Sequence, residues 1–221
     1  GAAGILRSDL PMISPILWTS IATGKTPDVH GVTWFMTDAP DGSKMTISSY
    51  ERQVRTFWNI ASEAGRSCGI VGWWATWPAE PINGWLASDY VAWHSFGVTG
   101  RSSVDQGKTW PPDLYQDVRP RIIAPDSVAW EEVEPYLSGD RRARSEFTPD
   151  EQDMLDEFRT LLASGQTYLD VALRLGERFR PQLEVVYFEG TDTVGHLFMP
   201  YRSPKLDGID PGRHLSFKEM V

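Results

Sequence analysis

Apolar residues recur at helical spacing near the N-terminus of the chain. The stripe lies between a Ser14-Pro15 pair and Gly24, and its members are Ile16, Trp18, Ile21 and Ala22. Proline is favoured in the first turn of a helix, and glycine commonly follows the last turn. The pattern therefore predicts a helix that stops at Gly24 and has Ser14 at or next to its N-cap.

Two more helical stretches are each followed by an apolar run. The stretch VRTFWNIASEAG has apolar residues at helical spacing, and SCGIVGWW after it has the composition of a buried strand. A longer stretch opens with Thr148 as cap and Pro149 in the first turn, and it runs to about Phe179 with a break at Gly165 left open. The run at 183–189 is apolar enough to predict a central strand.

Helices that alternate with buried strands predict an α/β fold with a mostly parallel sheet sandwiched by helices. We expect residues 1–93 and 148–221 to form the two parts of this core. Residues 94–147 are rich in Gly, Pro and polar side chains, which is typical of an inserted cap or a long excursion. Functional residues are expected in the loops that follow the carboxyl ends of the strands.

Charge and composition narrow the function classes. The 221 residues include 21 basic and 30 acidic side chains, and the only Lys/Arg-rich stretch is DRRARSEF at 140–147, so no nucleic-acid partner is expected. No run approaches the roughly 18 apolar residues of a membrane span, and GAAGILRSDL lacks the pattern of a signal peptide. A single cysteine, Cys68, excludes an internal disulfide. The cellular compartment and the oligomeric state stay open.

Ten tryptophans are many for a chain of this length. Several lie between residues 73 and 93, where indoles could either fill the core or line a ligand pocket. Trp74 could belong to a cleft that also contains polar residues of WPAEPINGWLASDY, such as Glu80 and Asp89. For those polar residues, turn and capping roles are the more conservative interpretation.

Asp192 and His196 follow the run at 183–189 and are separated by three residues. A carboxylate and an imidazole that leave a strand end in one loop can bind the same divalent cation, because zinc accepts oxygen and nitrogen ligands together. The alternative is that Asp192 caps a turn and His196 forms a hydrogen bond within the loop. The spacing alone leaves both interpretations open.

Ser14 also has two interpretations. A serine before a proline at a helix start is ordinarily an N-cap. However, the free N–H groups and the positive dipole end of a helix N-terminus also favour a bound phosphate. A hydroxyl in that position is therefore suitable for attack on phosphorus if a metal ion activates it.

Three stretches, taken in order, resemble the type I phosphodiesterase/nucleotide pyrophosphatase branch of the alkaline phosphatase superfamily. They are SPILWTSIATGKTPDVHGV, the stretch from FWNIASEAG to WLASDY, and VVYFEGTDTVGHLF. The resemblance covers roughly residues 1–93 and 180–221. In that family a Thr or Ser precedes a Thr-Gly pair by nine residues, and Pro-x-x-His-Gly follows, as with Ser14, Thr23 and His30 here.

The resemblance implies a fold, an activity and a set of site residues. The fold is an alkaline phosphatase-like core, and the reaction is hydrolysis of a small-molecule phosphate ester through a covalent phosphoseryl intermediate. Ser14 takes the position of the nucleophile, and Asp192 and His196 match two ligands of one ion. The implied cofactors are two divalent metal ions of the zinc type, the second of which would contact Ser14.

The chain also departs from the family pattern. A strand-end Asp before the nucleophile and an Asp-His-Gly segment with a further His are expected but not found, which leaves three of seven metal-site side chains. We therefore expect an internal piece of a longer enzyme that is inactive by itself. Phe35 stands where nucleotide pyrophosphatases have an Asn that contacts the phosphoryl oxygen, so Phe35, together with Trp74, is expected to contact a substrate other than a nucleotide. His30 is expected to be a structural hydrogen-bonding residue.

The rival hypothesis is a catalytically silent binding module on the same scaffold. Its Trp-lined cleft would bind a ligand, and its metal site would be incomplete. The flanking sequence of the gene discriminates between the two hypotheses: a strand-end Asp before Gly1 and an Asp-His-Gly segment after Val221 would indicate a truncated enzyme, and their absence would indicate a lost site.

Overall fold

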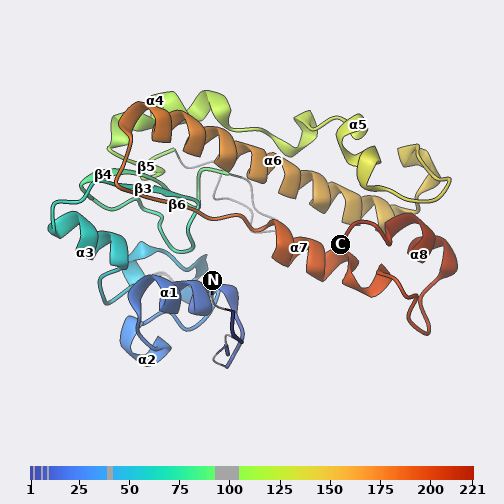
Figure 1. Ribbon diagram of the computed structural model, residues 1–221, viewed down its shortest axis with the longest axis horizontal. Coiled ribbons are helices and arrows are strands. Elements are labelled where there is room, and N and C mark those ends of the chain that lie inside the picture. The colour runs from blue at the N-terminus through green and yellow to red at the C-terminus, as the bar shows by residue number, and fades with distance from the viewer. Residues whose placement is uncertain (2, 6, 9, 39–41, 93–104) are drawn as a thin grey trace. The chain divides into compact units, whose positions relative to one another are not determined.

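The computed structural model describes residues 1–221 except 2, 6, 9, 39–41 and 93–104. The first part of the predicted insertion, 94–104, therefore lies outside the described residues. The chain divides into two compact units (Figure 1). Unit 1 consists of Gly1–Val91, Ser103–Pro120 and Val171–Val186, and unit 2 consists of Ala92–Ser102, Arg121–Asp170 and Tyr187–Val221.

A four-stranded sheet forms the centre of unit 1. Its strands are β3 (Cys68–Val71), β4 (Gly84–Ala87), β5 (Thr109–Trp110) and β6 (Leu183–Val186), in the order β5-β4-β3-β6. β3 pairs in parallel with β4 and β6, whereas β5 is antiparallel to β4. Figure 1 shows α3 (Phe57–Glu63) and the last turns of the long helix α6 (Pro149–Phe179) on opposite faces of the sheet. The predicted α/β fold is confirmed.

The prediction of a central strand at 183–189 is wrong for the part of the sheet that the structure describes. β6 lies at the edge, where its only described neighbour is β3, and Glu184 on it is exposed. An apolar run indicates that the side chains of a strand are partly buried on the faces of the sheet. It does not indicate whether the strand has a hydrogen-bonded neighbour on one side or on both.

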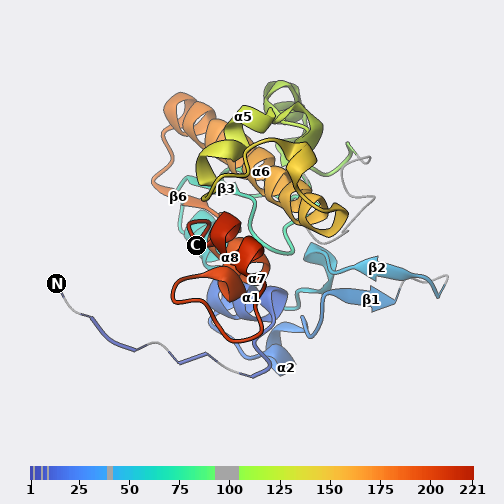
Figure 2. The same cartoon turned by 90° about the vertical axis from the view of Figure 1, so that its right-hand side faces the viewer.

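The other elements of unit 1 are short. Its helices also include α1 (Ser14–Thr23), α2 (Pro27–His30) and α4 (Tyr115–Val118). A hairpin of β1 (Met36–Asp38) and β2 (Lys44–Thr46) projects from the unit (Figure 2). Over both units, 3₁₀ turns lie at Ser49–Glu51, Pro112–Leu114, Arg119–Arg121, Pro125–Ser127, Glu134–Tyr136, Arg144–Glu146 and Met199–Tyr201.

Indoles fill the interior of unit 1. Trp58 and Trp85 are buried, and Trp73 packs edge to face against Trp18 and Phe57, with ring centroids 5.1 and 6.0 Å apart. Edge-to-face aromatic pairs contribute about 0.5–1.5 kcal/mol beyond the buried area. Of the two roles that the sequence left open for these tryptophans, the structure supports core packing, and it gives no support to the silent Trp-lined binding module.

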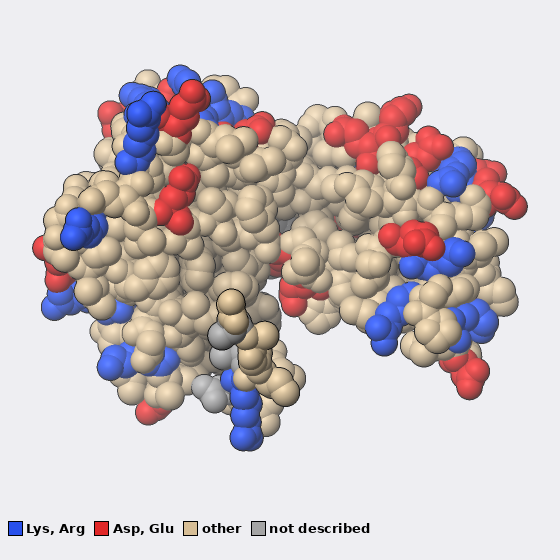
Figure 3. Space-filling view, viewed as in Figure 1, with Lys and Arg blue, Asp and Glu red and all other residues tan. Residues whose placement is uncertain are grey.

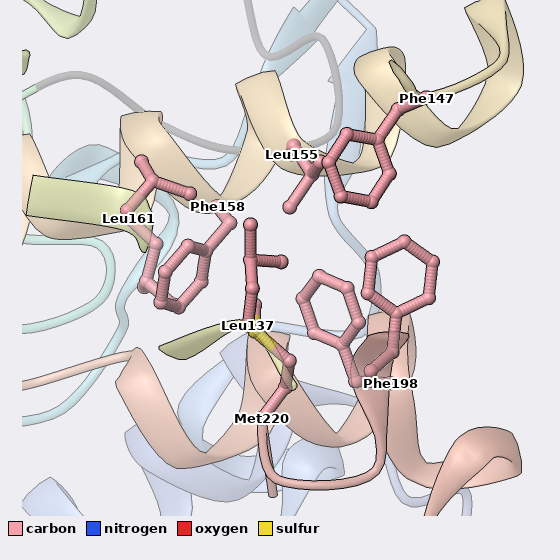
Figure 4. Close-up of a cluster of buried hydrophobic side chains, with 9 residues drawn as sticks. Leu137, Phe147, Leu155, Phe158, Leu161, Phe198 and Met220 are labelled. Atoms are coloured by element: carbon pink, nitrogen blue, oxygen red, sulfur yellow. The ribbon is translucent and has the colours of Figure 1, made fainter. Parts of the chain in front are cut away.

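Unit 2 is built around the N-terminal part of α6, which runs through Gly165 without a break. Helices α5 (Trp130–Val133), α7 (Gly190–Phe198) and α8 (Pro211–Phe217) are its other helices among the described residues. Figure 4 shows the apolar core of this unit, in which side chains from α6, α7 and the flanking segments meet. The buried members are Val133, Leu137, Phe147, Leu155, Phe158, Leu161, Phe198, Phe217 and Met220.

A buried ion pair stabilises the start of α6. The predicted cap is confirmed, because the Glu151 N–H donates to Thr148 Oγ1 and the Thr148 N–H donates to Glu151 Oε2 at 2.8 Å. Glu151 is buried, and Arg141 donates to both of its carboxylate oxygens at 2.8 and 3.0 Å. Burial alone would raise the pKa of Glu151, but the hydrogen bonds from Arg141 and Thr148 lower it below its ordinary value.

We predict that Glu151→Gln lowers the free energy of unfolding by about 2 kcal/mol at pH 7, because Arg141 loses its charged partner in a buried position. The carboxylate has a lowered pKa in the folded state, so its contribution is complete above about pH 5 and is lost as the pH falls below about 4. Urea titrations of both proteins at these pH values measure the difference. The exposed Glu131→Gln is the control, with an expected change below about 0.5 kcal/mol. A Glu151 variant as stable as wild type at pH 7 would contradict the prediction.

Candidate functional site

Ser14 is the first residue of α1, half-buried and followed by Pro15. The prediction that it lies at or next to the N-cap is confirmed, because the Leu17 N–H donates to the Ile13 carbonyl at 3.0 Å, which makes Ile13 the N-cap and Ser14 the residue after it. Among the described residues, the Ser14 hydroxyl has no hydrogen-bond partner. The hydroxyl is consequently available to a ligand at the N-terminus of the helix.

The other hydroxyls of α1 are not available in this way. Thr19 is buried, and its Oγ1 lacks a partner in the interior among the described residues. Ser20 Oγ is 3.0 Å from His30 Nε2. Ser14 is therefore better placed than Thr19 or Ser20 to react with a substrate.

His30 connects α1 to the turn after α2. It is fully buried, and its Nδ1 accepts the Val32 N–H at 3.1 Å. Since Nδ1 is an acceptor, Nε2 carries the proton and donates to Ser20 Oγ, which defines a neutral tautomer. Burial lowers the pKa of His30, while its own backbone and Asp28 act in the opposite direction. The expectation of a structural histidine is confirmed.

The turn after β3 carries the contacts that bring α1 to the sheet. Trp73 follows Val71 at the carboxyl end of β3, and its Nε1 donates to the Trp18 carbonyl at 3.2 Å. Trp18 lies one helical turn after Ser14, on the same face of α1. The helix that carries Ser14 therefore packs against the edge of the sheet at which α/β proteins ordinarily bind ligands.

Phe35 and Trp74 meet at this same turn. Their ring centroids are 5.9 Å apart at an interplanar angle of 67°, and Trp34 packs on Phe35 at 6.2 Å. Trp74 is 8% exposed, whereas Phe35 is 36% exposed. The structure thus brings together the two residues expected to contact a substrate, with Phe35 as the accessible ring.

Asp192 and His196 lie on α7 in unit 2. The expectation that they share a loop is wrong, because the helix begins at Gly190, directly after the strand exit. In a helix, residues four apart share a face, and Asp192 Oδ2 is 3.7 Å from His196 Nε2. Both side chains are more than half exposed, so the pair fits two ligands of one cation. The described residues contain no group of three or more His, Cys, Asp or Glu side chains arranged for a metal ion.

The candidate residues are distributed over the two units: Ser14, Phe35 and Trp74 belong to unit 1, and Asp192 and His196 belong to unit 2. On the face shown in Figure 3, basic side chains are interspersed with acidic ones. The absence of a nucleic-acid partner stays a prediction. No helix of the described residues is both long and apolar enough to cross a membrane.

The fold is that of an α/β protein, and in unit 1 the turn with Trp74 and the helix that begins with Ser14 lie at the carboxyl edge of a mostly parallel sheet. The chain belongs to the type I phosphodiesterase/nucleotide pyrophosphatase family, whose model matches residues 1–209. This match includes the middle third, which the sequence motifs left unassigned. Family membership supports a hydrolase that acts on small-molecule phosphate esters. Neither the curated proteins nor the solved structures contain a match.

The structural role of the buried His30 can be tested by measuring the free energy of unfolding at two pH values. The neutral form of His30 accepts the Val32 N–H, and its pKa is lowered in the folded state, so its contribution is present above about pH 6.5 and is lost at lower pH. We expect wild type to lose about 1 kcal/mol more unfolding free energy than His30→Gln between pH 7 and pH 5. The exposed His196→Gln, the control, should behave as wild type in these denaturant titrations. Equal losses in wild type and His30→Gln would contradict the assignment.

Proposed function

We propose that this protein hydrolyses phosphate esters, with Ser14 as the nucleophile. The observation that carries the proposal is the Ser14 hydroxyl at the start of α1, without a described partner, while Thr19 and Ser20 are buried or bound. The first N–H groups of α1 lack intrahelical partners and favour an anion. They would stabilise the phosphoryl oxygens next to the hydroxyl.

The reaction would proceed in two displacements. Ser14 Oγ forms a bond to phosphorus as the bond to the ester oxygen breaks, and the departing alkoxide or phenoxide takes up a proton. Water then attacks the phosphoseryl group, releases the phosphate product and restores the Ser14 hydroxyl. Because Ser14 Oγ is the nucleophile of the first displacement and the leaving group of the second, removal of that oxygen abolishes both displacements.

Asp192 and His196 would hold one divalent ion, for which zinc suits the oxygen and nitrogen donor set. Their 3.7 Å separation on one face of α7 supports this assignment. A bound zinc ion supplies Lewis-acid chemistry, which lowers the pKa of a neighbouring hydroxyl and neutralises phosphate charge. The family resemblance implies a second ion that Ser14 contacts. Phe35 and Trp74 would contact the organic part of the ester.

We predict that Ser14→Ala abolishes hydrolysis of an aryl phosphodiester, by at least about 10³-fold, in the protein expressed from its complete gene. The fold, followed by circular dichroism, should be unchanged, because the hydroxyl has no described partner to lose. Thr19→Val is the matched control, since it removes a buried hydroxyl of the same helix at nearly constant volume. Full activity in Ser14→Ala, or loss of activity in Thr19→Val alone, would disprove the assignment.

We predict weak zinc binding by the 221-residue chain, because Asp192 and His196 are two protein ligands where catalytic zinc sites ordinarily have three. Calorimetry should show this binding lost in His196→Ala and kept in His214→Ala, whose Nδ1 already contacts the Tyr201 carbonyl. With zinc added, we expect no hydrolysis of a bis-aryl phosphodiester above background. Tight binding of two ions per chain with turnover would show that other residues complete the site.

A further inference from the structure

Ala75, directly after Trp74, has a backbone conformation that alanine rarely adopts. Its φ is +55°, in the left-handed region, and the residue is completely buried. A side chain with a Cβ is disfavoured there, so such residues persist only where the surroundings hold them. They also occur preferentially at functional sites.

Two charged side chains, Asp89 and Arg52, form hydrogen bonds with the backbone of Ala75. The Ala75 N–H donates to Asp89 Oδ2 at 3.0 Å, and the Ala75 carbonyl accepts from Arg52 Nη1 at 3.1 Å. The other oxygen of Asp89, Oδ1, accepts the Trp77 N–H at 2.9 Å. Asp89 is buried, so these charge-assisted hydrogen bonds form away from competing water.

The strained residue is connected to both rings of the aromatic pair. Ala75 packs with Val32 and Ile47 in one buried cluster, and the Ile47 N–H donates to the Phe35 carbonyl at 2.9 Å. Trp74 is the residue before Ala75 in the chain, and its ring contacts Phe35. A change in the backbone of Ala75 would therefore displace both rings.

We propose that Asp89 is a positioning residue that keeps Ala75 in the left-handed conformation and thereby holds Phe35 and Trp74 as a subsite for a flat, uncharged ester group. The proposal rests on the proposed function for the identity of the ligand as a phosphodiester. Phe35 is 36% exposed and its side chain has no hydrogen-bond donor, so an aryl group gains more from this position than a small alkyl group. The expected consequence is a preference for aryl over alkyl diesters at the binding step.

The test compares the binding of diphenyl phosphate and diethyl phosphate to the 221-residue chain by calorimetry. Wild type should bind the diphenyl ester at least about tenfold more tightly. Phe35→Leu and Asp89→Asn should each weaken diphenyl phosphate more than diethyl phosphate and so reduce that preference several-fold. The amide introduced by Asp89→Asn has a single acceptor oxygen, so it would leave one of the two backbone N–H groups without an acceptor. Asp113→Asn, on the exposed surface, is the control for the loss of one carboxylate.

The decisive variant is the double change Asp89→Asn with Ala75→Gly. Glycine adopts a positive φ without strain, so the turn should keep its shape without Asp89, and the aryl preference should return. A merely structural role of Asp89 would not be rescued in this ligand-specific way. If Asp89→Asn does not fold, recovery of folded protein in the double variant is the expected result.

Three outcomes would overturn the proposal: no aryl preference in wild type, an unchanged preference in Asp89→Asn, or a double variant that recovers neither folding nor preference. These are distinct from failure of the proposed function. Hydrolysis that survives in Ser14→Ala disproves the nucleophile and leaves the aryl subsite in place. Normal Ser14-dependent hydrolysis with no aryl preference disproves the subsite alone.

Discussion

The packing of Trp73 against α1 is the interaction on which the rest of unit 1 depends. Trp73 leaves the carboxyl end of β3, contacts Trp18 edge to face and donates its indole N–H to the Trp18 carbonyl. One side chain thus joins the sheet to the helix that begins with Ser14. Because the backbone continues into Trp74 and the strained Ala75, the same turn sets the position of the helix that begins with Ser14 and of the aromatic pair.

Local patterns were sufficient for most of the fold. The cap of α6 at Thr148 and the alternation of helices with strands could be predicted, because they depend on residues close in sequence. At α1 the sequence placed Ser14 at or next to the cap but could not single out Ile13, because Ile13 has no capping side chain and supplies only the first carbonyl acceptor. The edge position of β6 was missed, because apolar composition does not count neighbouring strands.

The candidate site, like the fold, could be predicted from the sequence only in part. The spacing of Asp192 and His196 left a shared cation site and a structural role both open, and the helical geometry that places them on one face became visible only in the structure. Phe35 and Trp74 were both suggested by the sequence, but their contact joins segments distant in the chain. The turn role favoured for Asp89 agrees with its contacts to the Ala75 and Trp77 N–H groups. The conformation of Ala75 had no sequence signal, because alanine does not mark a left-handed conformation as glycine does.

The central claim is that Ser14 forms the covalent intermediate, and peptide mass spectrometry tests it most directly. The protein expressed from its complete gene is mixed with an aryl phosphodiester and quenched in acid within the first turnover. The account predicts an added phosphoryl ester on the peptide that contains Ser14, with fragment ions that place it on that residue. A modification on Thr19 or Ser20, or full turnover with no modified peptide, would contradict it.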